Sequence, residues 1–437
     1  MAGAGTDVQV ARGADGAVRI AAGSVPGLLG AYDDGGSGGA DFTRSVLDVA
    51  GAVLLWPVLE DPVLPVAEVH DAGRAQQWLW AVYGERTAAA VHACARGAGA
   101  QEPVTVRETA DRPAPLAGAA ARLGLAHWAA RWWPASYPDG IAALEPDVLG
   151  LESAALTHRC QQLFDQVGDQ PDDCVAELIE EHRAALAPLL RWWRAVPQPA
   201  DTARQLDGVL RLIDDAADGA GLDGPELRRL RTALDRGPEP ARTATAADPG
   251  TLFARQDGYA LAAGDARVAG GRVIARGSGT NDWRRYPPGL VDAAEDAVSW
   301  TARALGARRQ VEVEAVAHLA APGTGDFLVA EVRVNGNRVG RVPLARRDDL
   351  WTGRADVELP PDPSDATAAP RIDVEVLLPG FDPGAGPGNR ADRDAVRALA
   401  RRRLADAARP VADGAHDGVP GPFLAEILAA TAAREDY

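Results

Sequence analysis

The spacing of the apolar residues changes after residue 236, and that change limits the folds the chain can adopt. Within residues 61–236 they recur mostly every three or four positions, as Leu230 and Leu234 do. After residue 250 they alternate with polar residues, as Val311 and Val313 do. The first spacing is typical of an amphipathic helix and the second of a half-buried strand. We therefore expect two kinds of core, joined by the Pro-, Ala- and Thr-rich residues 237–250.

The predicted fold class is α+β, with a mainly α-helical N-terminal domain followed by an antiparallel β-sandwich with C-terminal helices. The expected divisions are a β-hairpin and loop element at 1–60, a helical domain at 61–236, the linker at 237–250, a β-sandwich-like domain at 251–380 and C-terminal helices at 381–437. With 437 residues, the chain is long enough for both larger parts to bury a core. The apolar run at residues 46–59 fits either a strand or a short helix.

Two local signals predict irregular backbone inside these elements. Pro188 lies within a helical stripe and should kink that helix or end it at Ala187. The turn at residues 335–336, Asn-Gly, predicts a two-residue hairpin. With that loop Arg341 would face inward on the returning strand, so we expect a bulge at Gly340 that returns the next valine to the core.

Lysine is absent from the sequence, so all 45 basic residues are arginine. This excludes a lysine Schiff base, a pyridoxal-phosphate lysine, a Walker-A lysine and a kinase strand lysine. Any ATP hydrolysis in the same pathway must therefore belong to a partner. The net charge of −17 argues against nonspecific binding to nucleic acid and against adsorption to an anionic membrane.

The cysteines and the N-terminus predict a cytoplasmic protein. Cys94, Cys160 and Cys174 form no CxxC pair, and an odd, low count fits a reducing compartment. No segment resembles a signal peptide or approaches the roughly 18 apolar residues of a membrane span. His158 and Cys160 lie two apart on a predicted helix and point to nearly opposite sides, so with His182 they give no zinc-site spacing. We predict no metal and no cofactor.

Residues 123–145 contain the densest aromatic cluster in the sequence, at the end of a predicted helix over 114–133. One interpretation is a ligand-binding pocket in which an arginine fork and indole faces hold an anionic or flat ligand. The other is a helix end whose rings fill the core while the basic groups satisfy the last carbonyls. The candidate ligand-binding residues are His127, Arg131, Trp132, Tyr137 and Asp139.

Two further apolar segments are candidates for an interaction surface. Residues 281–300 form a long insertion that contains Trp283 and Tyr286, and either binds a partner or caps one end of the sandwich. The last predicted helix, over 423–433, has Phe423 and Leu424 on one side. Such a helix either docks on its own domain or inserts into a partner's groove.

Catalytic signals are weak in this sequence. His70 beside Asp71 and His182 after two glutamates are acid–base pairs without a nucleophile motif. The GxSxG string at residues 35–39 lies in a predicted flexible loop without the strand-to-helix context of a nucleophile elbow, and there is no HExxH. A triad dispersed along the sequence would leave no local pattern, so we assign no catalytic residue.

Two short stretches of the sequence resemble a known group of proteins. RWWPAS at 131–136 with DGI at 139–141, and PPGLVD at 287–292 with EDAV at 295–298, resemble uncharacterised actinobacterial accessory proteins. Those proteins belong to ternary conflict systems built on a MoxR-type ATPase, a von Willebrand A protein and an accessory or β-propeller component. The resemblance implies a non-catalytic accessory role beside an ATPase. The chain lacks the blade repeats of a propeller, so it does not match that component.

The function that follows is a non-catalytic accessory or adaptor protein that acts through protein–protein contacts, with a partner ATPase. The alternative is a metal-independent hydrolase or small-ligand-binding protein with a pocket near the Trp-rich helix. An adaptor should expose apolar patches and have no deep polar pocket around His127 and Arg131. An enzyme should have a cleft where His127 or His70 meets a hydroxyl or a carboxylate.

Overall fold

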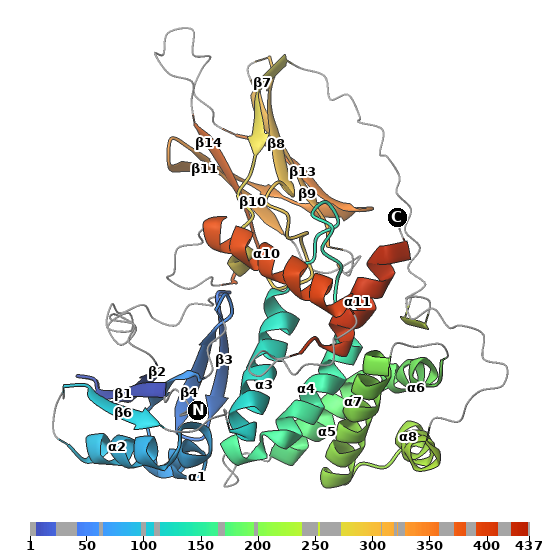
Figure 1. Ribbon diagram of the computed structural model, residues 1–437. Helices are drawn as coiled ribbons and strands as arrows, with labels where there is room; N and C mark the ends of the chain where they lie inside the picture. Colours follow the sequence, from blue (N-terminus) through green and yellow to red (C-terminus); the bar gives the residue numbers. More distant parts are fainter. Residues whose placement is uncertain are drawn as a thin grey trace.

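The computed structural model describes residues 6–22, 42–60, 64–97, 102–108, 114–164, 171–195, 200–237, 252–253, 272–306, 308–318, 321, 328–357, 371–381, 390–409 and 421–435. These residues form three antiparallel sheets with helices between and beside them (Figure 1). The predicted linker at 237–250 lies outside the described residues, apart from residue 237.

The first sheet has six strands in the order β3-β4-β5-β2-β1-β6. Its strands are β1 (Thr6–Arg12), β2 (Val18–Ala22), β3 (Arg44–Val49), β4 (Ala52–Pro57), β5 (Val66–Val69) and β6 (Val104–Glu108). β1 pairs with β2 next to it in sequence and also with β6, so that Val8 faces Val106. β6 is therefore one edge strand of the sheet, although it comes nearly a hundred residues after its neighbour β1 in the sequence.

Helices follow the fifth strand and fill the centre of the chain. They are α1 (Ala72–Tyr83), α2 (Glu85–Arg96), α3 (Pro115–Trp132), α4 (Pro146–Arg159), α5 (Pro171–His182), α6 (Leu186–Arg194), α7 (Ala200–Gly219) and α8 (Pro225–Arg236), with the 3-10 turns η1 (Gln161–Leu163) and η2 (Arg183–Ala185). A proline begins α3, α4 and α8, where its missing N–H leaves no hydrogen bond unmade.

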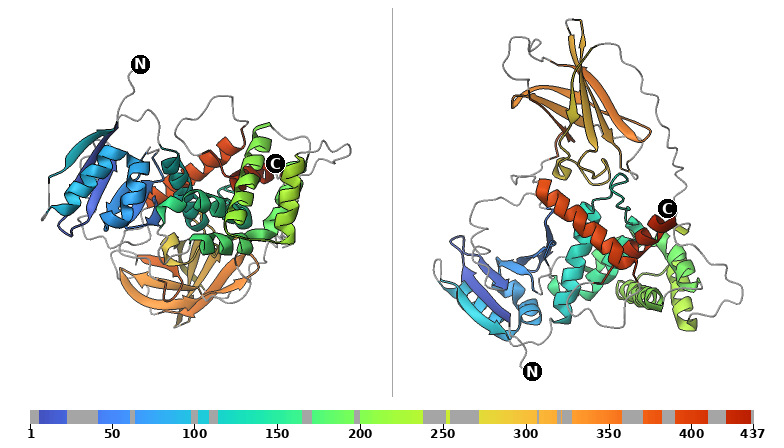
Figure 2. Two further views of the ribbon diagram at one scale, coloured as in Figure 1. Left: turned by 90° about the horizontal axis from the view of Figure 1, so that it is seen from below. Right: turned by 45° about the horizontal axis from the view of Figure 1, so that its top comes forward.

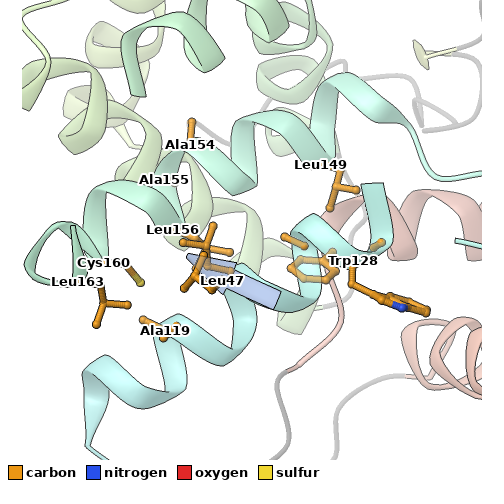
Figure 3. Packing of buried hydrophobic residues seen from close by; sticks show 14 of the residues in the cluster. Leu47, Ala119, Trp128, Leu149, Ala154, Ala155, Leu156, Cys160 and Leu163 are labelled. Atoms are coloured by element: carbon orange, nitrogen blue, oxygen red, sulfur yellow. The ribbon is translucent and has the colours of Figure 1, made fainter. Parts of the chain in front are cut away.

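α3 is the central helix of the first core and packs on both the sheet and α4. At Gly124 a Cβ would lie 3.2 Å from Ser45 Oγ and 3.3 Å from the Trp56 ring, so this glycine lets the helix approach β3 and β4 closely. Figure 3 shows Leu47 of β3 beside Leu156 of α4, with Ala119 of α3 close to Cys160 and Leu163 and Trp128 farther along α3. The strands and the helices therefore share one apolar core.

The other two sheets pack on each other and share a second core. One has the order β11-β10-β14 and the other β12-β13-β9-β8-β7. Their strands are β7 (Arg272–Ser278), β8 (Val298–Leu305), β9 (Arg308–Val316), β10 (Val329–Val334), β11 (Asn337–Pro343), β12 (Ala345–Arg347), β13 (Leu350–Asp356) and β14 (Ile372–Leu377), and the 3-10 turn η3 (Trp283–Arg285) precedes β8.

The last two described helices pack on each other, and α10 (Arg390–Ala407) also contacts the two-sheet unit. α10 lies between the two-sheet unit and the helices below it in Figure 1 and in the right view of Figure 2. α11 (Leu424–Glu435) packs on α4, and Phe423, Leu424 and Leu428 belong to the first core. The first core therefore contains residues from both β1 and α11.

The predicted fold class is wrong. The chain begins mostly with strands, the first sheet has six strands among the described residues, and the helices are spread along the chain. The ambiguous run at residues 46–59 forms two strands, β3 and β4, rather than a helix. Sequence periodicity shows which residues alternate, but it contains no information on pairing between distant strands such as β1 and β6.

The structure tests two local predictions, the strand bulge near Gly340 and the helix break near Pro188. Arg338 pairs with Arg333 and Gly340 with Val332, so β11 does contain a bulge, but its extra residue is Val339, one position before the predicted Gly340. The helix break expected at Ala187 occurs earlier, at η2, and Pro188 lies in the first turn of α6. Proline fits there because the first N–H groups of a helix have no partner inside it.

Gly51 is expected to tolerate no side chain. It lies in the two-residue turn between β3 and β4 with φ of +72°, and a Cβ would lie 2.3 Å from the Asp71 carbonyl oxygen. Gly51→Ala should therefore lower the free energy of unfolding by more than the roughly 1–3 kcal/mol of backbone strain alone. Gly140→Ala is the matched control, because φ there is +64° with no atom within 4 Å of the added Cβ. Equal losses in denaturant unfolding would contradict the proposed clash.

Candidate functional site

The C-terminal end of α3 forms a junction with the two-sheet unit rather than an open pocket. A crevice of about 40 Å³ lies there. Its main lining residues are Arg131, Trp132, Trp133, Trp283, Tyr286 and His318. Sites for small organic ligands typically occupy roughly 300–1,000 Å³. The crevice joins both aromatic stretches of the sequence but has no room for a substrate.

The residues predicted to bind a ligand do not converge. Arg131 and Trp132 line the crevice, and the guanidinium carbon lies 4.7 Å from the indole ring centroid. The His127 side chain is exposed on α3, but partial desolvation by neighbouring atoms lowers the pKa of its imidazole. Tyr137 is 64% exposed on the turn that follows. These side chains surround the helix end without facing a common space.

Asp139 serves a structural contact with α10. Its carboxylate pairs with Arg401 at 3.0 Å and with Arg397 at 3.4 Å. On the same helix, Arg393 is buried and pairs with Glu295 of the two-sheet unit at 2.6 Å. α10 therefore bridges the turn after α3 and the two-sheet unit through ion pairs in which Arg393 and Arg397 are the buried partners. Breaking one partner of such a pair is costly, since the other charge stays buried.

The four residues proposed as an interaction surface are buried within this chain. Trp283 is 7% exposed and packs on Phe42, with ring centroids 5.4 Å apart. Tyr286 is 3% exposed, and its hydroxyl donates a hydrogen bond to the Asn281 side-chain oxygen. Phe423 and Leu424 have no exposed surface. A partner could reach these four side chains only if the chain opened.

A wider open basin than this crevice lies elsewhere, at the start of α1. It has a volume of about 560 Å³. His70, Asp71, His92, Arg12 and Arg96 are among its lining residues. The Asp71 carboxylate caps α1 by accepting bonds from the Gly73 and Arg74 amides. The lining contains no hydroxyl or thiol, so the described residues supply no nucleophile beside His70.

A second groove, beside Trp80, is mainly apolar. It has a volume of about 400 Å³ and lies between α1, the first turns of α3 and the end of α4. Its lining residues are Trp80, Ala81, Ala114, Pro115, Leu116, Ala119, Arg159 and Gln162. Of the eleven tryptophans, nine are buried and Trp133 is half-buried, whereas Trp80 is 61% exposed. Trp80 is therefore the most exposed tryptophan of the chain, and it lies beside this groove.

The sequence contained a signal for Trp80 that the prediction did not use. Trp78 and Trp80 are two positions apart on one helix, so their side chains point to nearly opposite sides. Trp78 is fully buried, and its indole N–H donates to the Ala50 carbonyl at 2.9 Å. When one of two such residues anchors the helix in the core, the other must face solvent or a partner.

No three His, Cys, Asp or Glu side chains among the described residues gather closely enough to hold a metal ion. In the part of the chain that the structure describes, no helix combines the length and the apolar composition needed to cross a membrane. Comparison with known proteins gives no family: no protein-family model, no curated protein and no solved structure matches this chain significantly.

Proposed function

We propose that this protein is a non-catalytic accessory or adaptor protein and that it binds a protein partner through the groove beside Trp80. The observation that carries the proposal is the 61% exposure of Trp80 beside an apolar groove. Tryptophan is enriched among the residues that dominate binding energy at protein interfaces. A large exposed aromatic ring rimmed by aliphatic side chains is typical of such a docking site.

Two further features support an adaptor over the hydrolase alternative. The crevice near the Trp-rich helix has a volume of only about 40 Å³. The chain has no lysine for lysine-dependent chemistry. An ATPase is the partner we expect, in line with the resemblance to accessory proteins of ATPase-containing systems. The cysteines form no disulfide and Cys174 is exposed, which supports a reducing, cytoplasmic location.

Trp80→Ala should abolish recovery of the partner while the protein stays folded. An exposed side chain contributes little to folding, so stability should change by no more than about 0.5 kcal/mol. A hot-spot tryptophan, in contrast, contributes at least about 2 kcal/mol to binding, or roughly 30-fold in affinity. The measurement is affinity purification from the native host with quantitative mass spectrometry.

Tyr137→Ala is the matched control, because Tyr137 is equally exposed but lies in the turn after α3. It should retain the partner. Recovery of the same partner by wild type and Trp80→Ala in equal amounts would contradict the groove as the docking site. Recovery of no stable partner by the wild-type chain would contradict the adaptor function itself.

A further inference from the structure

We infer that the groove beside Trp80 receives an amphipathic helix of the partner protein, with a carboxylate placed on Arg159. This inference rests on the proposed function and specifies the partner's chemistry. Three features of the groove lead to it: its small apolar lining, its helical walls and the charge at one end.

The lining accommodates apolar side chains but has no strand edge that could pair with an extended peptide. Ala81, Ala114 and Ala119 are small and leave room for side chains from outside, and Leu116 adds an aliphatic wall. Ala81 lies inside α1 and Ala119 inside α3, where backbone groups bond within the helix, and only the amides of the first turn of α3 lack such a partner. An extended peptide would find no open strand edge in this lining, whereas a helix satisfies its own backbone.

The volume sets how much of a partner helix can enter. About 400 Å³ corresponds to a few large side chains rather than a whole domain. Apolar residues spaced three and four apart on one helix present such a short stripe. The Trp80 ring at the edge of the groove would then cover that stripe from one side.

Arg159 gives the groove its charge preference. It is exposed at the end of α4, and no carboxylate of the described residues pairs with its guanidinium. The lining includes no acidic residue, although the chain as a whole carries a net charge of −17. Other exposed arginines pair with acids, for example Arg211 with Asp207 at 2.8 Å. Arg159 therefore offers an unused fork of donors that matches a carboxylate.

The test is a selection of displayed helical and extended peptides on the full-length wild-type chain and its variants. Helical peptides with an apolar stripe and an Asp or Glu next to it should be enriched, and the enrichment should be lost on Trp80→Ala. For the best peptide, Arg159→Gln should weaken binding about three- to tenfold. Arg159→Glu should invert the preference from acidic to basic residues at that peptide position, and replacing the peptide acid by Arg should then restore affinity.

Arg191→Glu is the matched control, since Arg191 is an exposed arginine on α6, outside the groove lining. It should change neither enrichment nor affinity. Trp80-dependent peptides without a charge preference, or with an extended rather than helical pattern, would overturn this inference and leave the proposed function intact. If no enriched peptide depends on Trp80, both the inference and the docking site fall.

Discussion

Phe423→Ala is expected to release α11 from the helical core. Phe423 has no exposed surface, and its ring lies against the guanidinium groups of Arg122, at 5.0 Å, and Arg403, at 5.7 Å. Removing a buried phenylalanine costs about 3–5 kcal/mol, because transfer free energy is lost and a cavity remains. Two cation–π contacts disappear with it. The loss should fall mainly on α11, since Phe423 immediately precedes this helix.

Amide hydrogen exchange of residues 421–435 measures this release. Protection of that segment should fall by roughly 10²- to 10³-fold, the equivalent of about 3–4 kcal/mol. Phe381→Ala is the matched control, because Phe381 is only half-buried in a turn after β14. It should leave the segment protected. Unchanged protection of 421–435 in Phe423→Ala would show that α11 is held without this ring.

The second large effect is a pH dependence located at Glu152. This side chain of α4 is buried, and its carboxylate accepts a hydrogen bond from the Ala425 amide at the start of α11. Arg122 of α3 lies 3.5 Å away, and Glu426 of α11 repels the charge while pairing with Arg403 of α10. Burial dominates these effects and raises the pKa of Glu152 to about 7.

The sign of the effect follows from that raised pKa. Between the ordinary glutamate value of about 4.5 and about 7, the folded chain holds a proton that the unfolded chain releases. The stabilising contribution of this proton is therefore complete below pH 4.5 and is lost as the pH rises to 7. Above pH 7 the stability does not change further through this group. A difference of this size corresponds to about 3 kcal/mol.

Glu152→Gln should remove this pH dependence. The amide keeps a carbonyl acceptor for the Ala425 N–H but cannot ionise. Protection of α11 in the variant should therefore increasingly exceed that in wild type as the pH rises from 5 to 7, and the ratio should level off above pH 7. Hydrogen exchange of residues 421–435 in both proteins, compared at equal pH between 5 and 8, cancels the intrinsic exchange rate. A constant ratio between the two proteins across this range would rule out Glu152 as the titrating group.

Local features of this fold were predictable where one short stretch contains the whole signal. α8 ends at Arg236, where the predicted helical domain ends, because leucines such as Leu230 and Leu234 repeat at helical spacing up to that point. The bulge in β11 followed from the conflict between an Asn-Gly turn and the inward arginine. Each depends on interactions within about ten residues.

Features that depend on distant partners were not predictable. β6 pairs with β1, and β5 pairs with both β2 and β4. The alternation of apolar residues shows which face of a strand is buried, but it does not specify which strand pairs with which. At the site, Asp139 appeared to be a ligand-binding residue because it follows an aromatic cluster. It pairs with Arg397 and Arg401, which lie more than 250 residues later. A charged residue's role depends on such partners.

Because α11 comes near the end of the sequence, its packing surface on α4 is synthesised long before α11 itself. Glu152 and the amide it accepts from are 273 residues apart. At roughly 5–20 residues per second, a ribosome needs about 15 to 55 s to translate that interval. Throughout this interval, the surface of α4 against which α11 later packs has no native occupant. The nascent chain must therefore keep an apolar surface from aggregating until its last described helix has been synthesised.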